Sequence, residues 1–351
     1  MREGFLLDPE VAYFNHGGFG ACPVGVFEEY QRWQLELERD PAGFFTRVFE
    51  EATYEARAAL AAFVGARVDD LVFAANATSA LNAVLRSLRI RPNEEILTTK
   101  HEYGAILRTL GFIRANVVLV EPAELIASIG IRTRAIVVSH VTSPTALVLP
   151  VEEVCDAARK AGVLSIVDGA HVPGHLPLDL EAIGADVYAG NCHKWLCAPK
   201  GCGFLWARPE HQEWIEPLVV SWGYHEEAGF GERHGWQGTR DPAACLAVPK
   251  AIEVHATFDA ARARALADEA ERALGTYGLR PLRGTRAPFM RALTVRTGDP
   301  EAFGRRLYEE HRVEIPVYAF EDTALLRVSI GSYNDEADLD RLVDAVRAVL
   351  V

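Results

Sequence analysis

Asn191-Cys192-His193-Lys194-Trp195-Leu196 is the stretch that decides the fold, together with Asp168-Gly169-Ala170-His171 upstream. Each stretch follows an apolar, strand-like run, so each places one reactive side chain at a strand end: an amine at Lys194 and a carboxylate at Asp168. The chain has only five lysines, and few amines therefore compete for a chemical role. Lys200 is the nearest rival, but residues 199–201 are typical of a turn, in which a lysine points to water.

The pair Lys194 and Asp168 suits one kind of chemistry. Burial and a nearby positive group lower the pKa of a lysine, whose amine can then form a Schiff base with an aldehyde. A carboxylate at a strand end keeps a pyridine nitrogen protonated, so that the ring can accept electrons when a substrate loses its α-proton. His171 is expected to orient Asp168 or to meet a phenolic oxygen. The alternatives are a surface lysine, and a carboxylate that caps a helix or joins an ion pair.

Size and charge place the chain among ordinary globular proteins. Its 351 residues suffice for one large domain and a smaller one. The net charge of -13 disfavours nucleic acid as a partner, because phosphates attract basic surfaces. The apolar runs are too short to span a membrane, and residues 1–9 are too acidic for a secretory signal. We therefore expect a cytoplasmic protein with no nucleic-acid or membrane partner.

Six cysteines occur, and in a long chain without a signal they are expected to be reduced thiols. Cys192, Cys197 and Cys202 surround His193, which makes zinc the alternative to weigh. Their C-x4-C-x4-C spacing lacks the close C-x2-C pairs of structural zinc sites. No metal is therefore expected, and the cysteines are predicted to be small buried hydrophobes.

Strand-like and helix-like segments alternate through most of the chain. Buried strands with helical crossovers predict an α/β fold with a mostly parallel sheet flanked by helices. Ligands bind beyond the carboxyl ends of such strands, which is where Asn76, His140, Asp168 and Asn191 fall. The strands are expected at residues 70–74, 95–98, 117–120, 135–140, 164–168, 186–190 and 203–207, with helices at 78–88, 103–115 and 151–161.

The last third of the chain predicts a small α+β domain. A short helix at 243–247 and a long one from 251 to 274 are expected to link it to the large domain. Strand 292–296, helix 300–310, strand 324–330 and helix 336–350 follow, the last with one apolar face. We predict a segment 1–20 that crosses near the active site, a large cofactor-binding domain 21–245, and a linking helix with a small C-terminal domain at 246–351.

Further candidates lie outside the two decisive stretches. Residues 75–82 predict a strand-to-helix turn, in which Thr78 and Ser79 cap the helix or free N–H groups bind a phosphate. The turn 237–240 has the same two interpretations. Tyr103 is a candidate for stacking on a planar cofactor, although a plain loop tyrosine is the simpler interpretation. Arg327 is a charge inside a strand and needs an anion, for which a substrate carboxylate is suited.

These residues resemble those of a known family. Asn76-Ala77-Thr78, Val167-Asp168-Gly169-Ala170-His171 and His193-Lys194, in this order and at these intervals, are similar to motifs of the class V aminotransferase superfamily, the fold-type I enzymes that use pyridoxal 5'-phosphate. Segments 13–20, 140–145 and 238–242 resemble the isopenicillin N epimerase-like branch. The resemblance covers nearly the whole chain, and its motifs are more specific for the superfamily than for the branch.

The resemblance implies roles around the cofactor ring. Lys194 forms the Schiff base and moves protons, and Asp168 pairs with the pyridine nitrogen. Tyr103 falls where the family stacks a ring on the cofactor, and it joins Lys194 and Asp168 as an expected catalytic residue. Ser143 and His171 fall where the family contacts the phenolic oxygen.

The resemblance also implies phosphate and substrate contacts. Thr239 matches a phosphate ligand donated by a second subunit, which implies a homodimer with shared active sites. Arg327 matches the arginine that binds the α-carboxylate of a small-molecule amino-acid substrate, and Asn15 and His16 are expected to line the substrate side. Within one subunit, the residues at phosphate-binding positions are Ala77, Thr78, Asn191 and His193.

The implied function is an enzyme that acts at the α-carbon of an amino acid. Proton return to the opposite face gives epimerisation, proton delivery to the cofactor gives transamination, and loss of a β-substituent gives a carbon–sulfur lyase. The sequence leaves these three open, with Tyr103, His16 or a residue of the second subunit as the second base. A persulfide-forming cysteine desulfurase is not expected, because no cysteine follows Cys245.

Two other classes remain as alternatives. One is a non-catalytic regulatory module that binds the cofactor without turnover, since a retained fold does not prove an activity. The other is a nicotinamide dehydrogenase, for which Gly17-Gly18-Phe19-Gly20 has the wrong glycine spacing.

Overall fold

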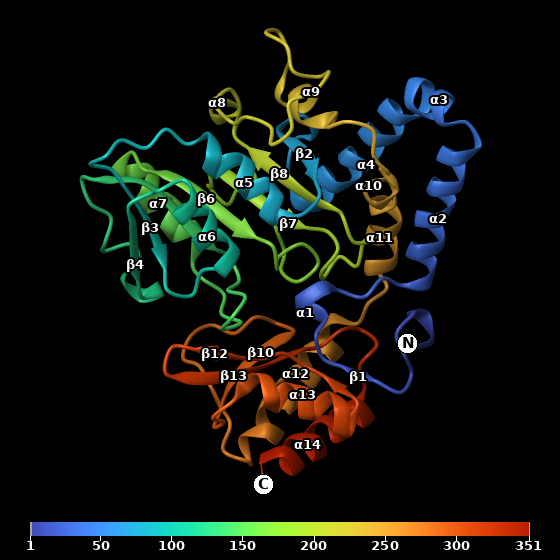
Figure 1. The fold of residues 1–351 in the computed structure, drawn as a ribbon, viewed down its shortest axis with the longest axis vertical. Coiled ribbons are helices and arrows are strands. Elements are labelled where there is room, and N and C mark those ends of the chain that lie inside the picture. The colour runs from blue at the N-terminus through green and yellow to red at the C-terminus, as the bar shows by residue number, and fades with distance from the viewer. Residues whose placement is uncertain (1, 351) are drawn as a thin grey trace.

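The computed structural model describes residues 2–350, so the predicted boundaries at Met1 and Val351 lie outside the described residues. A large domain with a central sheet lies above a smaller C-terminal domain (Figure 1). The strands of the central sheet are β2 (Leu71–Ala74), β3 (Glu95–Thr99), β4 (Val117–Val120), β5 (Thr133–Ser139), β6 (Leu164–Gly169), β7 (Val187–Asn191) and β8 (Gly203–Ala207).

This seven-stranded sheet has the order β2-β8-β7-β6-β5-β3-β4. Strands β7, β6, β5, β3 and β4 run parallel to their neighbours, whereas β8 is antiparallel to both β2 and β7. The predicted mostly parallel sheet flanked by helices is confirmed. Every residue of β5 except Arg134 is buried, as expected for a strand covered on both faces.

Helices cover both faces of the sheet. The helices up to residue 255 are α1 (His16–Phe19), α2 (Val24–Arg39), α3 (Pro41–Gly43), α4 (Phe49–Val64), α5 (Ala77–Ser87), α6 (Gly104–Phe112), α7 (Val151–Ala161), α8 (Pro209–Gln212), α9 (Phe230–Gly235), α10 (Ala243–Leu246) and α11 (Val248–His255). Among them, α4 and α7 pack on one face and α5 and α6 on the other. Alternate residues of β5 join different cores. Ile136 and Val138 pack in the core that includes α4 and α7, while Ala135 and Val137 pack with α5 and α6.

Helix α7 shows why local sequence predicts such elements well. Its first turn holds Glu152 and Glu153 and its last turn holds Arg159 and Lys160, which complements the helix dipole. Gly162 follows in the left-handed conformation, with φ of 68°, which ends the helix. Its observed bounds equal the predicted ones.

The small domain contains β9 (Arg280–Pro281), β10 (Met290–Val295), β11 (Val313–Glu314), β12 (Val317–Phe320), β13 (Thr323–Ser329), α12 (Ala260–Gly275), α13 (Pro300–His311) and α14 (Glu336–Leu350). Its antiparallel sheet has the order β12-β13-β10-β9. The N-terminal strand β1 (Ala12–Tyr13) pairs in parallel with β11, and Phe14 is buried in the small-domain core.

The prediction of one long helix over residues 251–274 is wrong, because the structure has two helices in this range. Helix α11 ends at His255 and α12 begins at Ala260. The carboxylate of Asp259 accepts the Arg262 N–H at 2.9 Å and so caps a new helix start. Phe258, between the two helices, packs on His255 with ring centroids 5.5 Å apart.

The N-terminal segment passes directly under the lysine-bearing loop. Gly20 has φ of 70°, and a Cβ there would lie 1.9 Å from the His193 carbonyl oxygen. Gly174 has φ of 80°, and its Cβ would clash with the Trp195 backbone at 2.7 Å. Only glycine fits these two approaches. Across residues 2–350, each helix is too short or too polar to cross a bilayer.

Candidate active site

Most of the predicted site residues line one cavity of about 190 Å³. It lies past the carboxyl ends of β2, β5, β6 and β7, from whose following residues it is built. Strands 164–168 and 186–190 were predicted from apolar runs, and their ends bring together side chains that are far apart in sequence. The predicted residues that line it are Ala77, Thr78, Tyr103, Ser143, Asp168, His171, Asn191, His193 and Lys194.

Lys194 is half-buried, and its Nζ lies 3.1 Å from His171 Nε2. Its pKa is lowered to about 7, first because protein replaces water around the ammonium and second because of the Arg327 charge, while Asp168 acts in the opposite direction. A large fraction of this amine is therefore neutral near pH 7 and able to act as a nucleophile or a base.

Asp168 is the buried carboxylate of the site. Its Oδ1 accepts the Ala170 N–H at 2.8 Å, which fixes the carboxyl group at the end of β6. Burial is the largest cause that raises its pKa. A protonated ring nitrogen placed beside it would offset this loss of solvation and favour the ionised form.

The opposite end of the cavity is the N-terminus of α5. The Ala77 N–H donates to Asn191 Oδ1 at 2.8 Å, and the Ser79 N–H donates to Asn76 Oδ1 at 2.8 Å. The predicted capping by Thr78 and Ser79 is wrong, because Asn76 and Asn191 supply the capping oxygens. No hydrogen bond from the Thr78 amide is found within residues 2–350, and phosphate binding at this turn stays a prediction. A helix N-terminus with a free amide suits an anion.

His193 stands beside this helix end. Its Nδ1 donates to the Cys202 carbonyl at 3.0 Å, so the other ring nitrogen remains available. Burial lowers the pKa of His193 to about 4. A phosphate held nearby would shift this pKa upward and turn the ring into a donor.

Tyr103 and Ser143 also line the cavity, and Arg327 is hydrogen-bonded to Ser143. Tyr103 is 43% exposed, and so its ring is accessible in the cavity. Arg327, from β13 of the small domain, donates to the Ser143 carbonyl at 2.6 Å and to Ser143 Oγ at 3.1 Å. Arg327 is buried, and its Nε has no partner among the described residues. A buried guanidinium with a free N–H is suited to bind a carboxylate.

Four predicted residues do not line this cavity, namely Arg327, Asn15, His16 and Thr239. Asn15 donates to Glu314 Oε1 at 3.2 Å, and both His16 ring nitrogens are engaged, with Lys194 O at 3.1 Å and Tyr333 Oη at 3.2 Å. Thr239 is exposed. Gly18 and Phe19, which follow His16 in the sequence, line the cavity instead. The roles of Asn15, His16 and Thr239 stay predictions.

Sequence reasoning missed a buried carboxyl group, Glu102. Its Oε1 accepts the Ser139 hydroxyl at 2.6 Å and the Tyr103 N–H at 2.7 Å. Burial, followed by the charge of Asp168, raises the pKa of Glu102 to about 7. Glu102 therefore holds the loop that carries Tyr103. Nothing local signals its burial, because its neighbours His101 and Tyr103 are also polar.

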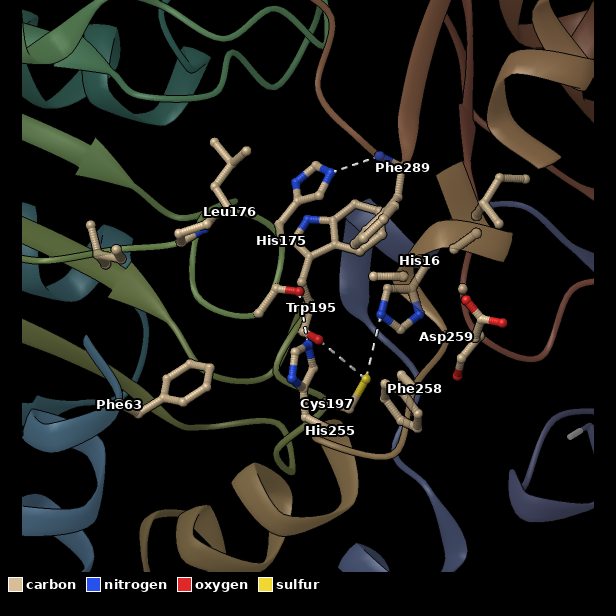
Figure 2. Close-up of a pocket in the computed structure, with 18 residues that line it drawn as sticks. His16, Phe63, His175, Leu176, Trp195, Cys197, His255, Phe258, Asp259 and Phe289 are labelled. Carbon is tan, nitrogen blue, oxygen red and sulfur yellow. Dashed lines mark hydrogen bonds between the residues drawn. The ribbon is translucent and has the colours of Figure 1, made fainter. Parts of the chain in front are cut away.

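A second cavity of about 320 Å³ lies between the two domains (Figure 2). Aromatic and imidazole rings line it, among them His175, Trp195, His255, Phe258 and Phe289. Trp195 also donates from Nε1 to His171 Nδ1 at 3.4 Å, so this residue connects the two cavities. Residues 2–350 contain no group of three or more His, Cys, Asp or Glu side chains that could hold a metal ion.

The smaller cavity has the parts that pyridoxal 5'-phosphate requires. Lys194 supplies an amine of lowered pKa, Asp168 a buried carboxylate, and Thr78 a free amide at a helix N-terminus. These three groups lie along one cavity, as the aldehyde, ring nitrogen and phosphate of the cofactor demand.

Comparison with known proteins gives the family. Residues 27–342 match the family model described as aminotransferase class-V. The chain belongs to the class V aminotransferase family. Pyridoxal 5'-phosphate is accordingly the cofactor, and the predicted family and fold class are confirmed.

Three individual proteins that are similar to this chain indicate its branch within the family. Isopenicillin N epimerase of Streptomyces clavuligerus is 36% identical, over 99% of this chain and 97% of that protein. A probable chloroplastic L-cysteine desulfhydrase of Arabidopsis thaliana is 27% identical, over 98% and 84%. The solved structure of the cysteine desulfurase CsdA from Escherichia coli has a TM-score of 0.84 and 25% identity, over 99% and 97%. The chain is thus isopenicillin N epimerase-like, with lyases also among its relatives.

Proposed function

We propose that this class V enzyme uses Lys194 as its Schiff-base lysine and epimerises an amino acid at the α-carbon. One observation carries the proposal: Lys194 Nζ lies 3.1 Å from His171 Nε2 in a cavity that also holds Asp168. The full-length similarity to isopenicillin N epimerase supports this reaction type. Because both Lys194 and Asp168 are in place, a purely regulatory module is the weaker interpretation.

Each residue has a proposed task. When bound, pyridoxal 5'-phosphate supplies an electron sink for the charge left at the substrate carbon. The Lys194 amine takes the α-proton, for which a pKa of about 7 is well matched near neutral pH. Asp168 keeps the ring nitrogen protonated. Arg327 binds the substrate carboxylate from the small domain, and this fixes which C–H bond faces Lys194.

Elimination of a β-substituent is the second candidate. The L-cysteine desulfhydrase relative supports a carbon–sulfur lyase, and transamination uses the same residues. The three outcomes differ only in where the proton and the β-substituent go after Lys194 has acted. Tyr103 is the proposed second base for epimerisation, because it lines the cavity while His16 does not.

We also propose that no cysteine persulfide is formed. Cysteine desulfurases share this fold, but such chemistry needs a thiolate that reaches the substrate. None of the six cysteines lines the Lys194 cavity. Burial raises the pKa of the Cys22 thiol, the one that is half-buried, to about 11.

A homodimer is the proposed assembly. Thr239 is exposed and does not line the Lys194 cavity of its own chain. Its predicted phosphate contact therefore needs a second subunit. Equilibrium sedimentation of the holoenzyme tests the assembly, and a monomer with full activity would contradict it. The cytoplasmic location stays a prediction from composition.

The deciding experiment is incubation of the holoenzyme with a panel of L-amino acids in heavy water. Epimerisation predicts solvent deuterium at the α-carbon with a racemised product. Keto acid with the amine form of the cofactor indicates transamination, pyruvate with ammonia indicates a lyase, and a protein-bound persulfide would contradict the exclusion above. Absence of α-deuterium with every amino acid would contradict the proposed function.

A further inference from the structure

The hydrogen bonds around His171 fix where its proton sits. The indole N–H of Trp195 can only donate, so His171 Nδ1, at 3.4 Å, accepts. Burial lowers the pKa of His171 well below its usual value, and a neutral imidazole carries one proton. That proton is therefore on Nε2, which lies 3.1 Å from Lys194 Nζ. At this contact His171 donates and the lysine nitrogen accepts, as only an unprotonated nitrogen can.

A second histidine holds the tryptophan in place. The ring of His175 stacks on Trp195 with centroids 4.1 Å apart and planes at 24°. The backbone N–H of Phe289 donates to His175 Nε2 at 3.0 Å, so His175 Nδ1 carries the proton and donates to the His171 carbonyl at 2.9 Å. Figure 2 shows His175 bonded to Phe289 at the edge of the small domain, with Trp195 beside it.

The chain contains the same pair a second time, away from the site. Trp214 Nε1 donates to His211 Nδ1 at 3.3 Å, and His211 Nε2 lies 3.4 Å from Asp186 Oδ1. A carboxylate accepts, so His211 must carry a proton on Nε2 there, in agreement with an accepting Nδ1. The two pairs differ in what Nε2 faces, a carboxylate in one and an amine in the other.

We propose that Trp195 is a positioning residue that fixes His171 as the Nε2–H tautomer, so that a donor faces the nitrogen of Lys194. His175, anchored by the small domain, keeps the indole at the required angle. The consequence is a lysine nitrogen that is held unprotonated by a neighbour that can only donate to it. This deepens the proposed function and rests on the role of Lys194 given there.

The first test is the tautomer itself, read by nitrogen-15 NMR of the histidine-labelled holoenzyme. The signals of His171 are assigned as those that are lost in the variant His171→Gln. They should show a protonated Nε2 and an unprotonated Nδ1. A protonated Nδ1 in the wild-type protein overturns the proposal without any tryptophan variant. The measurement does not involve turnover, so its outcome is independent of which reaction the enzyme catalyses.

The second test is Trp195→Phe, which keeps an aromatic ring beside His175 and removes the indole N–H together with the rest of the five-membered ring. Loss of one neutral hydrogen bond should change the tautomer ratio of His171 by roughly fivefold. Trp214→Phe is the matched control, which should alter His211 alone. Unchanged His171 signals in Trp195→Phe would overturn the proposal.

The third readout is the pH dependence of cofactor uptake by the cofactor-free protein. The groups whose charges act on His171 and Lys194 are Asp168, His175, His193 and Arg327, and none of them changes in the variant. Once His171 can accept, Lys194 is able to hold a proton, so the midpoint of uptake should move to higher pH by about half a unit or more. The same midpoint as in wild type would contradict the proposal. If sodium borohydride fails to link the cofactor to Lys194 while the tautomer is as expected, the proposed function fails and the tautomer assignment stands.

Discussion

The Lys194 cavity and the cavity between the domains differ in their lining residues more than in volume. The cavity between the domains is the larger, at about 320 Å³ against about 190 Å³, and rings and aliphatic side chains make up most of its wall. The smaller one holds Asp168, His171, His193 and Lys194, each with a pKa displaced chiefly by burial. Burial also lowers the pKa values of His16, His175 and His255 in the larger cavity. What distinguishes the smaller cavity is that it holds a desolvated amine together with a buried carboxylate.

The two cavities differ because different structural elements line them. Strand ends of one rigid sheet fix the polar groups of the smaller cavity, so their charges stay desolvated and close together. The walls of the larger cavity come from two domains, and polar groups in them bond across the boundary, as in the hydrogen bond from the Phe289 backbone N–H to His175 Nε2 at 3.0 Å. The following experiments test this contrast, from the largest expected effect to the smallest.

Lys194→Ala should have the largest effect. The variant lacks the amine that forms the Schiff base and takes the α-proton, so turnover should fall by about 10³-fold or more. The visible absorbance that borohydride bleaches should also be absent. Retained turnover above about a tenth of wild type would remove Lys194 from its proposed role.

Asp168→Asn should follow, with a loss of roughly 10²-fold in kcat. The amide can still accept the Ala170 N–H but cannot hold a protonated ring nitrogen by charge. The fluorescence and absorbance of bound cofactor report whether the variant is loaded. Equal kcat in the loaded variant and the wild type would contradict the role of the carboxylate.

Arg327→Ala should raise KM by roughly 10- to 100-fold, the range for a lost charge-assisted hydrogen bond. Cofactor retention should change less, because Lys194 and Asp168 belong to the large domain and line the cavity, whereas Arg327 comes from β13 and does not line it. Arg296→Ala, an exposed arginine of the same domain, is the control. Equal loss of substrate and cofactor binding would show that Arg327 has a structural role instead.

The pH dependence of Schiff-base formation should report the pKa of Lys194. This pKa is lowered to about 7, so the neutral fraction rises about tenfold per pH unit below that value and levels off above it. Stopped-flow absorbance after addition of the cofactor measures the rate. A rate that keeps rising to pH 10, as for an ordinary lysine, would show that the surroundings do not lower this pKa.

Ala263→Leu should have the smallest effect. Ala263 lines the cavity between the domains, and a larger aliphatic side chain there should fill space with less than about a twofold change in kcat/KM. The midpoint temperature of its thermal unfolding should change by only a few degrees. A loss of activity comparable to that of Arg327→Ala would mean that the larger cavity takes part in the reaction.

Local sequence patterns predicted the sheet closely because each signal was local. Strands β4 and β8 and helices α7 and α14 have the predicted bounds, since apolar runs, end charges and glycine lie within the segment. The sequence did not reveal the break between α11 and α12, because the alanine-rich pattern continues on both sides of it, although Asp259 caps the second helix.

The candidate site divides in the same way. The positions of Asp168 and Lys194 at strand ends follow from the sequence, since parallel strands share one carboxyl edge. The burial of Glu102 does not, because it depends on Ser139 from another strand. The sequence also does not reveal that the His16 ring is hydrogen-bonded to Tyr333.

The sequence by itself determined the class V family, the cofactor, and the strand ends that carry the lysine and the aspartate, because these depend on residue type and short-range order. Only the tertiary structure decided which partners each side chain meets. Arg327 reaches Ser143 across 184 positions of sequence. The proton on His171 is placed by the Trp195 indole, and that indole stacks on His175, which accepts a backbone N–H of the other domain. Such contacts depend on how distant segments pack, and packing sets the burial and the direction of every hydrogen bond.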